Sequence, residues 1–178
     1  MVLAQCLFFD EPDIVVCIDP KGDDWGPLVL RDACRRANLP FVYIDARRGK
    51  PFQFNVFQGA TKDELIALIA AGYDLHPKGS SDDHYRTLEQ DAVESIVEYV
   101  EDNPTIRDFY DAALNLFSDS ELESIQGLLS KLKQDAKLCA VNSKAGPKIS
   151  DLLSSGGVFW FVGSEDDLSV VRMQRIFA

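Results

Sequence analysis

The sequence predicts an α/β fold in which a parallel sheet is interrupted by an inserted all-α helical bundle. Two short apolar runs, Ile14–Ile18 and Phe41–Ile44, each stop at an acidic residue and are separated by a helical pattern. After residue 60 the hydrophobic period changes to 3.6 for some seventy residues, and a third apolar run, Gly156–Gly163, follows. Strands that alternate with helices are typical of a parallel sheet, and a long helical interruption indicates an insertion.

The first strand ends in a charged turn that is the first candidate for chemistry. An unbroken apolar run is typical of a strand that helices cover on both faces. The run ends at Asp19 and continues as Pro-Lys-Gly-Asp, so Asp19, Lys21 and Asp23 lie at the carboxyl end of the strand. Open α/β sheets bind ligands at this end. The structural alternative is a charged turn in which Asp23 or Asp24 caps the next helix.

A helix and a second strand complete a βαβ unit. Trp25–Ala37 carries apolar residues at helical spacing, and Asn38 followed by Pro40 marks its end. Phe41–Ile44 is the second strand and stops at Asp45. Because the crossover makes the strands parallel, we expect Asp19 and Asp45 at the same edge of the sheet.

Capping signals divide the helical region. Thr61 with Glu64, and Ser118 with Glu121, have the spacing of capping boxes. A further helix is expected to begin at Pro104, since proline suits the first helical position. A last helix is expected to run from Leu122 through Leu132. Several amphipathic helices with short connections predict a small bundle.

The longest predicted helix presents one apolar stripe and one acidic face. The stripe, on which aromatic side chains are expected to be buried, consists of Tyr85, Leu88, Ala92, Ile96 and Tyr99. The residues expected off the stripe, in solvent, are Glu89, Glu94, Glu98 and Glu101. Glu98, Glu101 and Asp102 also form a candidate surface for a basic partner.

The chain returns to α/β at its end. Gly156–Gly163 is too apolar to be solvated on either face, and Glu165–Ala178 has a helical pattern. In that helix Leu168, Val171, Met173 and Ile176 are expected to face inward. Both ends of the chain read as interrupted helices, which we interpret as a piece of a longer protein.

Composition excludes some functions. The 178 residues carry a formal net charge of −11, which argues against a surface that clamps nucleic acid. No apolar run approaches the roughly 20 residues that cross a bilayer. A cytoplasmic chain is expected because its cysteines read as reduced thiols. The four cysteines, Cys6, Cys17, Cys34 and Cys139, form no C-x-x-C pair and predict reduced, mostly buried thiols without a metal.

Asp82, Asp83 and His84 resemble an acid–base cluster, but adjacent helical residues point to different faces.

Four segments in this order resemble the type IV coupling proteins, the TraD/TraG-type ATPases of bacterial conjugation. They are Val15–Asp23 with its Asp-Pro-Lys-Gly-acid ending, Phe41–Asp45 followed by Phe54-Asn55, the helical segments 82–86 and 104–110, and Gly156–Ser164 with Gln174 in the next helix. The resemblance spans nearly the whole chain, although each segment alone has low specificity.

The resemblance implies a partial RecA-like P-loop NTPase sheet with the family's all-α domain inserted. It implies a first part over 1–59, the all-α domain over 60–140, and a return to the RecA-like domain over 141–178. The family's nucleotide site needs a Gly-rich turn ending in Gly-Lys-Ser/Thr, and the sequence contains none. The fragment would therefore lie between the Walker A and Walker B motifs. No cofactor is expected in it, while ATP and Mg²⁺ are implied for the full-length protein, as is a hexamer anchored in the inner membrane.

By the same resemblance the helical insertion would recruit a relaxase–DNA complex, the relaxosome, or a secreted protein substrate, with DNA contact in the full-length protein. Asp19, Lys21 and Asp23 would border the nucleotide or a neighbouring subunit. Two alternatives remain open. One is a free-standing small α/β enzyme that uses Asp19 and Asp23, and the other is a nucleic-acid-binding module.

Overall fold

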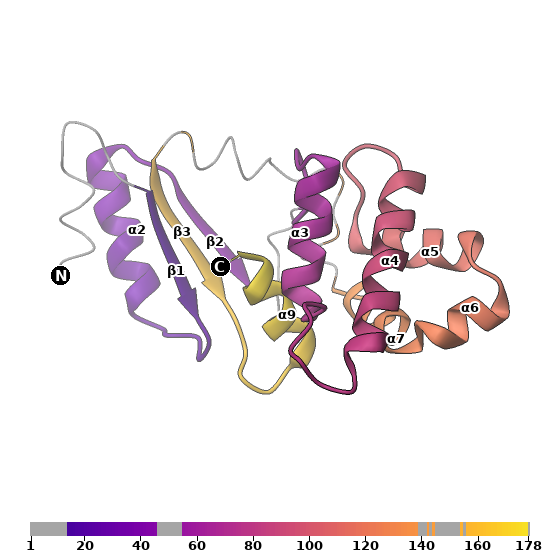
Figure 1. Ribbon diagram of the computed structural model, residues 1–178. Helices are drawn as coiled ribbons and strands as arrows, with labels where there is room; N and C mark the ends of the chain where they lie inside the picture. The colour runs from indigo at the N-terminus through magenta and orange to yellow at the C-terminus, as the bar shows by residue number, and fades with distance from the viewer. Residues whose placement is uncertain are drawn as a thin grey trace.

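The computed structural model describes residues 14–45, 55–138, 142, 144, 154 and 156–177. Its sheet has three parallel strands, β1 (Ile14–Asp19), β2 (Phe41–Asp45) and β3 (Gly157–Val162), in the order β1-β3-β2 (Figure 1). The last strand in the chain is thus the central one, with all six residues buried. The predicted α/β class and parallel sheet are confirmed. Cys6, Phe54, Cys139 and Ala178 lie outside the described residues.

The register brings the strand ends together. Asp19 of β1 and Asp45 of β2 both pair with Val162 of β3. The expectation that the two acids lie at one edge of the sheet is therefore confirmed. At the opposite end, Gly157 has a φ of 102°, and a Cβ there would lie 2.3 Å from the carbonyl oxygen of Pro40. Only glycine fits this position.

Helix α2 (Gly26–Ala37) covers one face of the sheet. It ends where the sequence predicts, because Asn38 adopts the left-handed conformation with a φ of 54°. Leu30, Cys34 and Trp160 are buried in the core beneath it. Cys34 and the half-buried Cys17 are free thiols, in agreement with their prediction.

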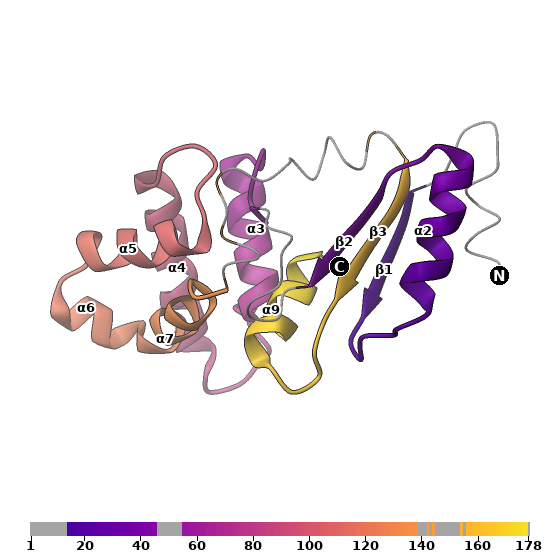
Figure 2. The ribbon, with the colours of Figure 1, turned by 180° about the vertical axis from the view of Figure 1, so that it is seen from behind.

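Between β2 and β3 the chain forms five described helices. They are α3 (Lys62–Tyr73), α4 (Asp83–Tyr99), α5 (Ile106–Leu116), α6 (Asp119–Ser124) and α7 (Gln126–Asp135). In both ribbon views α4–α7 lie on the far side of α3 and α9 from the sheet (Figures 1 and 2). The predicted inserted helices are therefore present.

Three capping boxes fix helix starts in this region. Those at Thr61 and Ser118 are confirmed, and a third at Thr105 with Asp108 was not predicted. The expectation of a helix start at Pro104 is wrong, because Thr105 is the N-cap and α5 begins at Ile106. The expectation of one continuous last helix is also wrong, since a break at Ile125 separates α6 from α7.

The buried face of α4 differs from the predicted stripe. Tyr85 and Tyr99 are 61% and 55% exposed, while Glu89 is only 8% exposed. The buried apolar residues are Ala92, Val93, Ile96 and Val97. Because α3 and α5 both contact α4, the helix buries a face that is rotated toward Val93 and Val97, which leaves the two tyrosines at its edge.

Helix α9 (Leu168–Phe177) follows β3 and is shorter than the predicted span from Glu165. Val170, Met173 and Ile176 belong to the main core, which also contains Phe159 and Phe161 of β3. The expected inward position of Leu168 is wrong, because its side chain is 67% exposed at the start of the helix.

Strand β1 is an edge strand of the described sheet and is incompletely covered. Its alternate residues Ile14, Val16 and Ile18 are 46%, 47% and 38% exposed. Residues two apart share a face of a strand, so these three form an apolar stripe. The described residues include no helix that is long and apolar enough to cross a membrane.

Candidate functional site

The Asp19 carboxylate is held by the backbone of its own turn. Its Oδ1 accepts hydrogen bonds from the N–H groups of Lys21 at 3.1 Å and Gly22 at 2.9 Å, and its Oδ2 accepts one from Asp23 at 2.5 Å. Gly22 permits this wrapping with a φ of 76°. Partial burial opposes ionisation, but these backbone donors outweigh it and lower the pKa of Asp19.

Asp23 continues the turn into α2. Its Oδ1 accepts the N–H of Trp25 at 3.0 Å, and its Oδ2 would lie 2.8 Å from a Cβ on Gly26. The helix N-cap is Trp25, without a side-chain cap, so neither Asp23 nor Asp24 is the N-cap. Asp23 nevertheless supports the helix start, as the structural alternative expected. The Lys21 side chain is exposed.

The three predicted site residues thus share one turn at the carboxyl end of β1. Asp45 lies two strands away at the same edge and is 3% exposed. Because Asp19 accepts three hydrogen bonds from the backbone of its own turn, it stabilises that turn, and the exposed Lys21 is the group most open to a ligand. Binding of a nucleotide or a neighbouring subunit by Asp19, Lys21 and Asp23 stays a prediction.

The Asp82–His84 cluster stabilises a loop. Asp83 accepts N–H groups from Lys78 at 2.9 Å, Gly79 at 2.7 Å and Ser80 at 3.1 Å, and pairs with Arg86 at 2.8 Å. These donors, the Lys78 N–H first, lower the pKa of Asp83 to about 2. A carboxylate of such low basicity is a poor proton acceptor near neutral pH.

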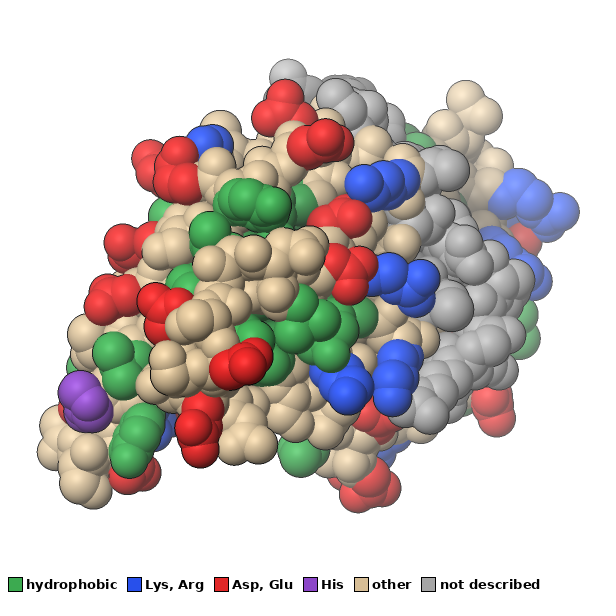
Figure 3. Space-filling view, turned by 90° about the vertical axis from the view of Figure 1, so that its right-hand side faces the viewer, with side chains coloured by type: hydrophobic (Ala, Val, Ile, Leu, Met, Phe, Trp, Pro, Cys, Tyr) green, Lys and Arg blue, Asp and Glu red, His purple; other side chains and the backbone are tan. Residues whose placement is uncertain are grey.

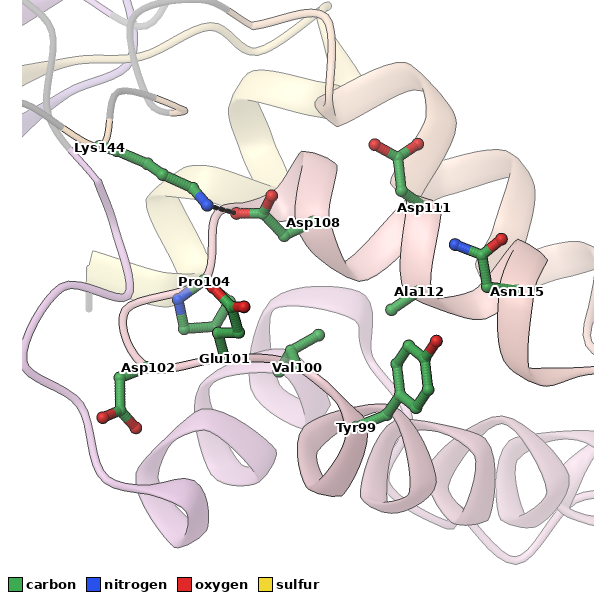
Figure 4. Close-up of a pocket in the computed structure, with 10 residues that line it drawn as sticks. All are labelled: Tyr99, Val100, Glu101, Asp102, Pro104, Asp108, Asp111, Ala112, Asn115 and Lys144. Atoms are coloured by element: carbon green, nitrogen blue, oxygen red, sulfur yellow. Dashed lines mark ion pairs between the residues drawn. The ribbon is translucent and has the colours of Figure 1, made fainter.

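A cavity of about 340 Å³ lies between the end of α4 and α5 (Figure 4). We call it the acidic cleft, and four of its lining residues are the acids Glu101, Asp102, Asp108 and Asp111. The other lining residues are Tyr99, Val100, Pro104, Ala112, Asn115 and Lys144. Two of the three residues of the predicted acidic surface, Glu101 and Asp102, therefore line this cleft. The third, Glu98, lies outside it and pairs with Lys62 at 2.7 Å.

One acid of the cleft is already neutralised. Asp108 accepts the N–H and the hydroxyl of Thr105 at 2.8 Å and 2.9 Å, and Lys144 lies 3.2 Å away, as Figure 4 shows. Although burial opposes ionisation, these donors lower the pKa of Asp108. In the described part of the chain Glu101, Asp102 and Asp111 have no ion-pair partner within 4.0 Å. The cleft thus keeps negative charge available to a cationic ligand.

Sequence reasoning missed a buried ion pair that joins α7 to α9. Arg172 donates two hydrogen bonds to Asp135, at 2.7 Å and 2.6 Å, and further ones to Gln134 and Ser169, both at 3.2 Å. Asp135 is fully buried. Burial first, and then the neighbouring Asp135 charge, raise the pKa of Tyr73 well above its usual value. The available signal was the spacing of Arg172, which lies four residues before the inward Ile176 and so on the same side of the helix.

The comparisons with known proteins give one partial match. The chain is 38% identical over 92 residues to "Mobilization protein A" of Escherichia coli. The match covers 51% of this chain and 16% of that protein, so the chain spans only a small part of its relative. No family model matches the chain, and no solved structure matches it. Among the described residues, no group of three His, Cys, Asp or Glu side chains could hold a metal ion.

Proposed function

We propose that the protein takes part in the conjugative transfer of DNA. The observation that carries this proposal is the 38% identity to a protein named for mobilization. The chain also resembles the conjugative coupling proteins in four segments and in the order of its strands and helices. Both lines point to the same process, which is why we place the protein in it.

Within that process we propose that the chain is part of a coupling-protein ATPase core with its helical insertion. The division at residues 59 and 140 follows the resemblance, and the parallel sheet interrupted by α3–α7 supports it. β1 lies at an edge of the described sheet, where a further strand could pair with it, and the exposed stripe of Ile14, Val16 and Ile18 is an apolar face that a further helix could cover. ATP and Mg²⁺ would then bind the assembled protein, with Asp19, Lys21 and Asp23 at the border of that site.

The helical insertion is proposed to recruit a protein of the relaxosome or a secreted substrate. The support is the acidic cleft, in which Glu101, Asp102 and Asp111 are unpaired among the described residues. Tyr99 lies beside them and is 55% exposed, so it offers a ring face to an arginine or lysine side chain. Acidic side chains also spread over the face of the bundle in Figure 3, with most Lys and Arg side chains toward one side. A basic protein segment complements this surface.

A pull-down with matched charge reversals tests the recruiting role. The cleft variant carries Glu101→Lys and Asp111→Lys. The control carries Glu94→Lys and Glu123→Lys, which are exposed, lie outside the cleft and change the net charge equally. Relaxosome proteins of the cognate element should be retained by the wild type and the control, and lost by the cleft variant. Equal retention by both variants would remove the cleft from the proposal.

An ATPase assay tests the proposed position within the parent protein. The isolated chain has no phosphate-binding Gly-Lys-Ser/Thr turn, so it is expected to show no turnover with ATP and Mg²⁺. Robust hydrolysis by purified chain would contradict the proposed fragment and would favour a self-sufficient enzyme instead.

A further inference from the structure

A second cavity, of about 240 Å³, opens between the helical bundle and α9, and we call it the basic pocket. Four cationic side chains line it, contributed by three helices. Arg86 comes from α4, Lys131 from α7, and Arg172 and Arg175 from α9. Four cations gathered in one pocket stand out in a chain with a net charge of −11. Like charges at close range repel one another, so such a cluster needs negative groups nearby.

Two of the four cations already have partners. Arg172 is committed to the buried Asp135, and Arg86 pairs with Asp83 at 2.8 Å. Lys131 and Arg175 have no carboxylate within 4.0 Å in the described part of the chain. The Lys131 Nζ donates a long hydrogen bond, 3.5 Å, to the carbonyl oxygen of Tyr73.

The acids that line the same pocket do not compensate this pair by contact. Asp74 is held by Lys78, whose Nζ lies 2.5 Å from its Oδ2. The Glu89 carboxylate lies against Gly127, where a Cβ would be 2.5 Å from its Oε1. Gly127 is in the first turn of α7, and the N-terminal end of a helix favours a negative charge. The first turn of α7 thereby stabilises Glu89, which forms no ion pair with Lys131 within 4.0 Å.

We propose that the basic pocket binds a phosphoryl anion between Lys131 and Arg175. The tetrahedral oxygens of a phosphoryl group can be contacted from several helices at once, whereas a carboxylate offers two oxygens in one plane. The anion is either a free phosphate group or a backbone phosphate of single-stranded nucleic acid. It would tie the bundle to α9 and so to the strand β3 that precedes this helix. The inference does not depend on the role of the acidic cleft.

Binding to the whole chain is measured with two probes at physiological salt. Inorganic pyrophosphate is titrated by calorimetry, and a labelled single-stranded oligonucleotide by fluorescence anisotropy. The pocket variant is Lys131→Gln with Arg175→Gln. The matched control is Lys133→Gln with Arg31→Gln, two exposed cations that do not line the pocket. Circular dichroism establishes that both variants are folded.

The pocket variant should bind about tenfold or more weakly than the wild type, because two charge-assisted contacts are removed, while the control changes little. Pyrophosphate should also raise the thermal midpoint of the wild type but not of the pocket variant, which gives a readout within the native protein. Binding of pyrophosphate alone identifies a free anion as the ligand, and preferential binding of the oligonucleotide identifies nucleic acid. Failure of both probes to bind, or equal weakening by the control, would overturn the proposal.

Discussion

Replacing Arg172 with methionine would leave the carboxylate of Asp135 buried without its cation. Asp135 is 0% exposed, and it receives two guanidinium hydrogen bonds at 2.6 Å and 2.7 Å. Breaking a buried pair by removing one partner typically costs about 3–5 kcal/mol, because the remaining charge is uncompensated. We therefore expect Arg172→Met to lower the free energy of unfolding by about 3–5 kcal/mol.

Changing Asp135 as well shows whether the loss of stability comes from an uncompensated buried charge or from lost packing. Asp135→Leu should cost a similar amount, yet the double variant should be far more stable than the sum of the two losses, since no charge is left buried. Urea denaturation followed by circular dichroism measures all three. Arg175→Met, an exposed change one turn further along α9, is the control and should be nearly neutral. Losses below about 1 kcal/mol, or strictly additive ones, would refute the reasoning.

Three further predictions concern other parts of the fold. Gly157→Ala should destabilise the fold by about 1–3 kcal/mol, because φ is 102° and the new Cβ would meet Pro40. Gly79→Ala should cost less, because Gly79 has a φ of 75° but lies in open space. Denaturation midpoints of the two variants compare these costs. The pKa of Asp83 is lowered from 3.8 to about 2 in the folded chain, so its contribution to the free energy of unfolding is present above about pH 4 and is lost as the pH falls through 2. Asp83→Asn should therefore flatten the dependence of the free energy of unfolding on pH in this window. An unchanged pH dependence would exclude a stabilising role of the Asp83 carboxylate. Val16 lies in the exposed apolar stripe of β1, so Val16→Lys should reduce concentration-dependent association of the purified chain in sedimentation measurements without changing its thermal midpoint. A wild type that is monomeric at all concentrations would contradict association through this stripe.

Local signals carried the prediction of the fold where short-range chemistry decides the conformation. The capping boxes at Thr61 and Ser118 need only residues three apart, and Asn38 ends α2 through its own backbone. The position of Asp19 and Asp45 at the same end of the sheet followed from the right-handed βαβ crossover, which makes β1 and β2 parallel. What periodicity could not supply was the direction of each helix face relative to its neighbours.

Helix α4 illustrates that limit. Its sequence supports several apolar stripes, and the choice among them depends on where α3 and α5 lie, which is a tertiary property. The buried Glu89 depends in the same way on the first turn of α7, and the Asp135–Arg172 pair joins residues 37 apart in the chain. For the candidate site, sequence reasoning found Glu101 and Asp102. It could not find the contribution of Asp111, because the cleft forms only when α4 and α5 pack.

Mating frequency tests the proposed role most directly. Donor cells that carry the conjugative element with the gene deleted are complemented with the wild-type gene, with the cleft variant Glu101→Lys/Asp111→Lys, or with the control Glu94→Lys/Glu123→Lys, and transconjugants are counted. The account predicts transfer with the wild type and the control, and a loss of at least about tenfold with the cleft variant, as expected when two interfacial charges are reversed. Undiminished transfer from donors that lack the gene would contradict a role in conjugation altogether.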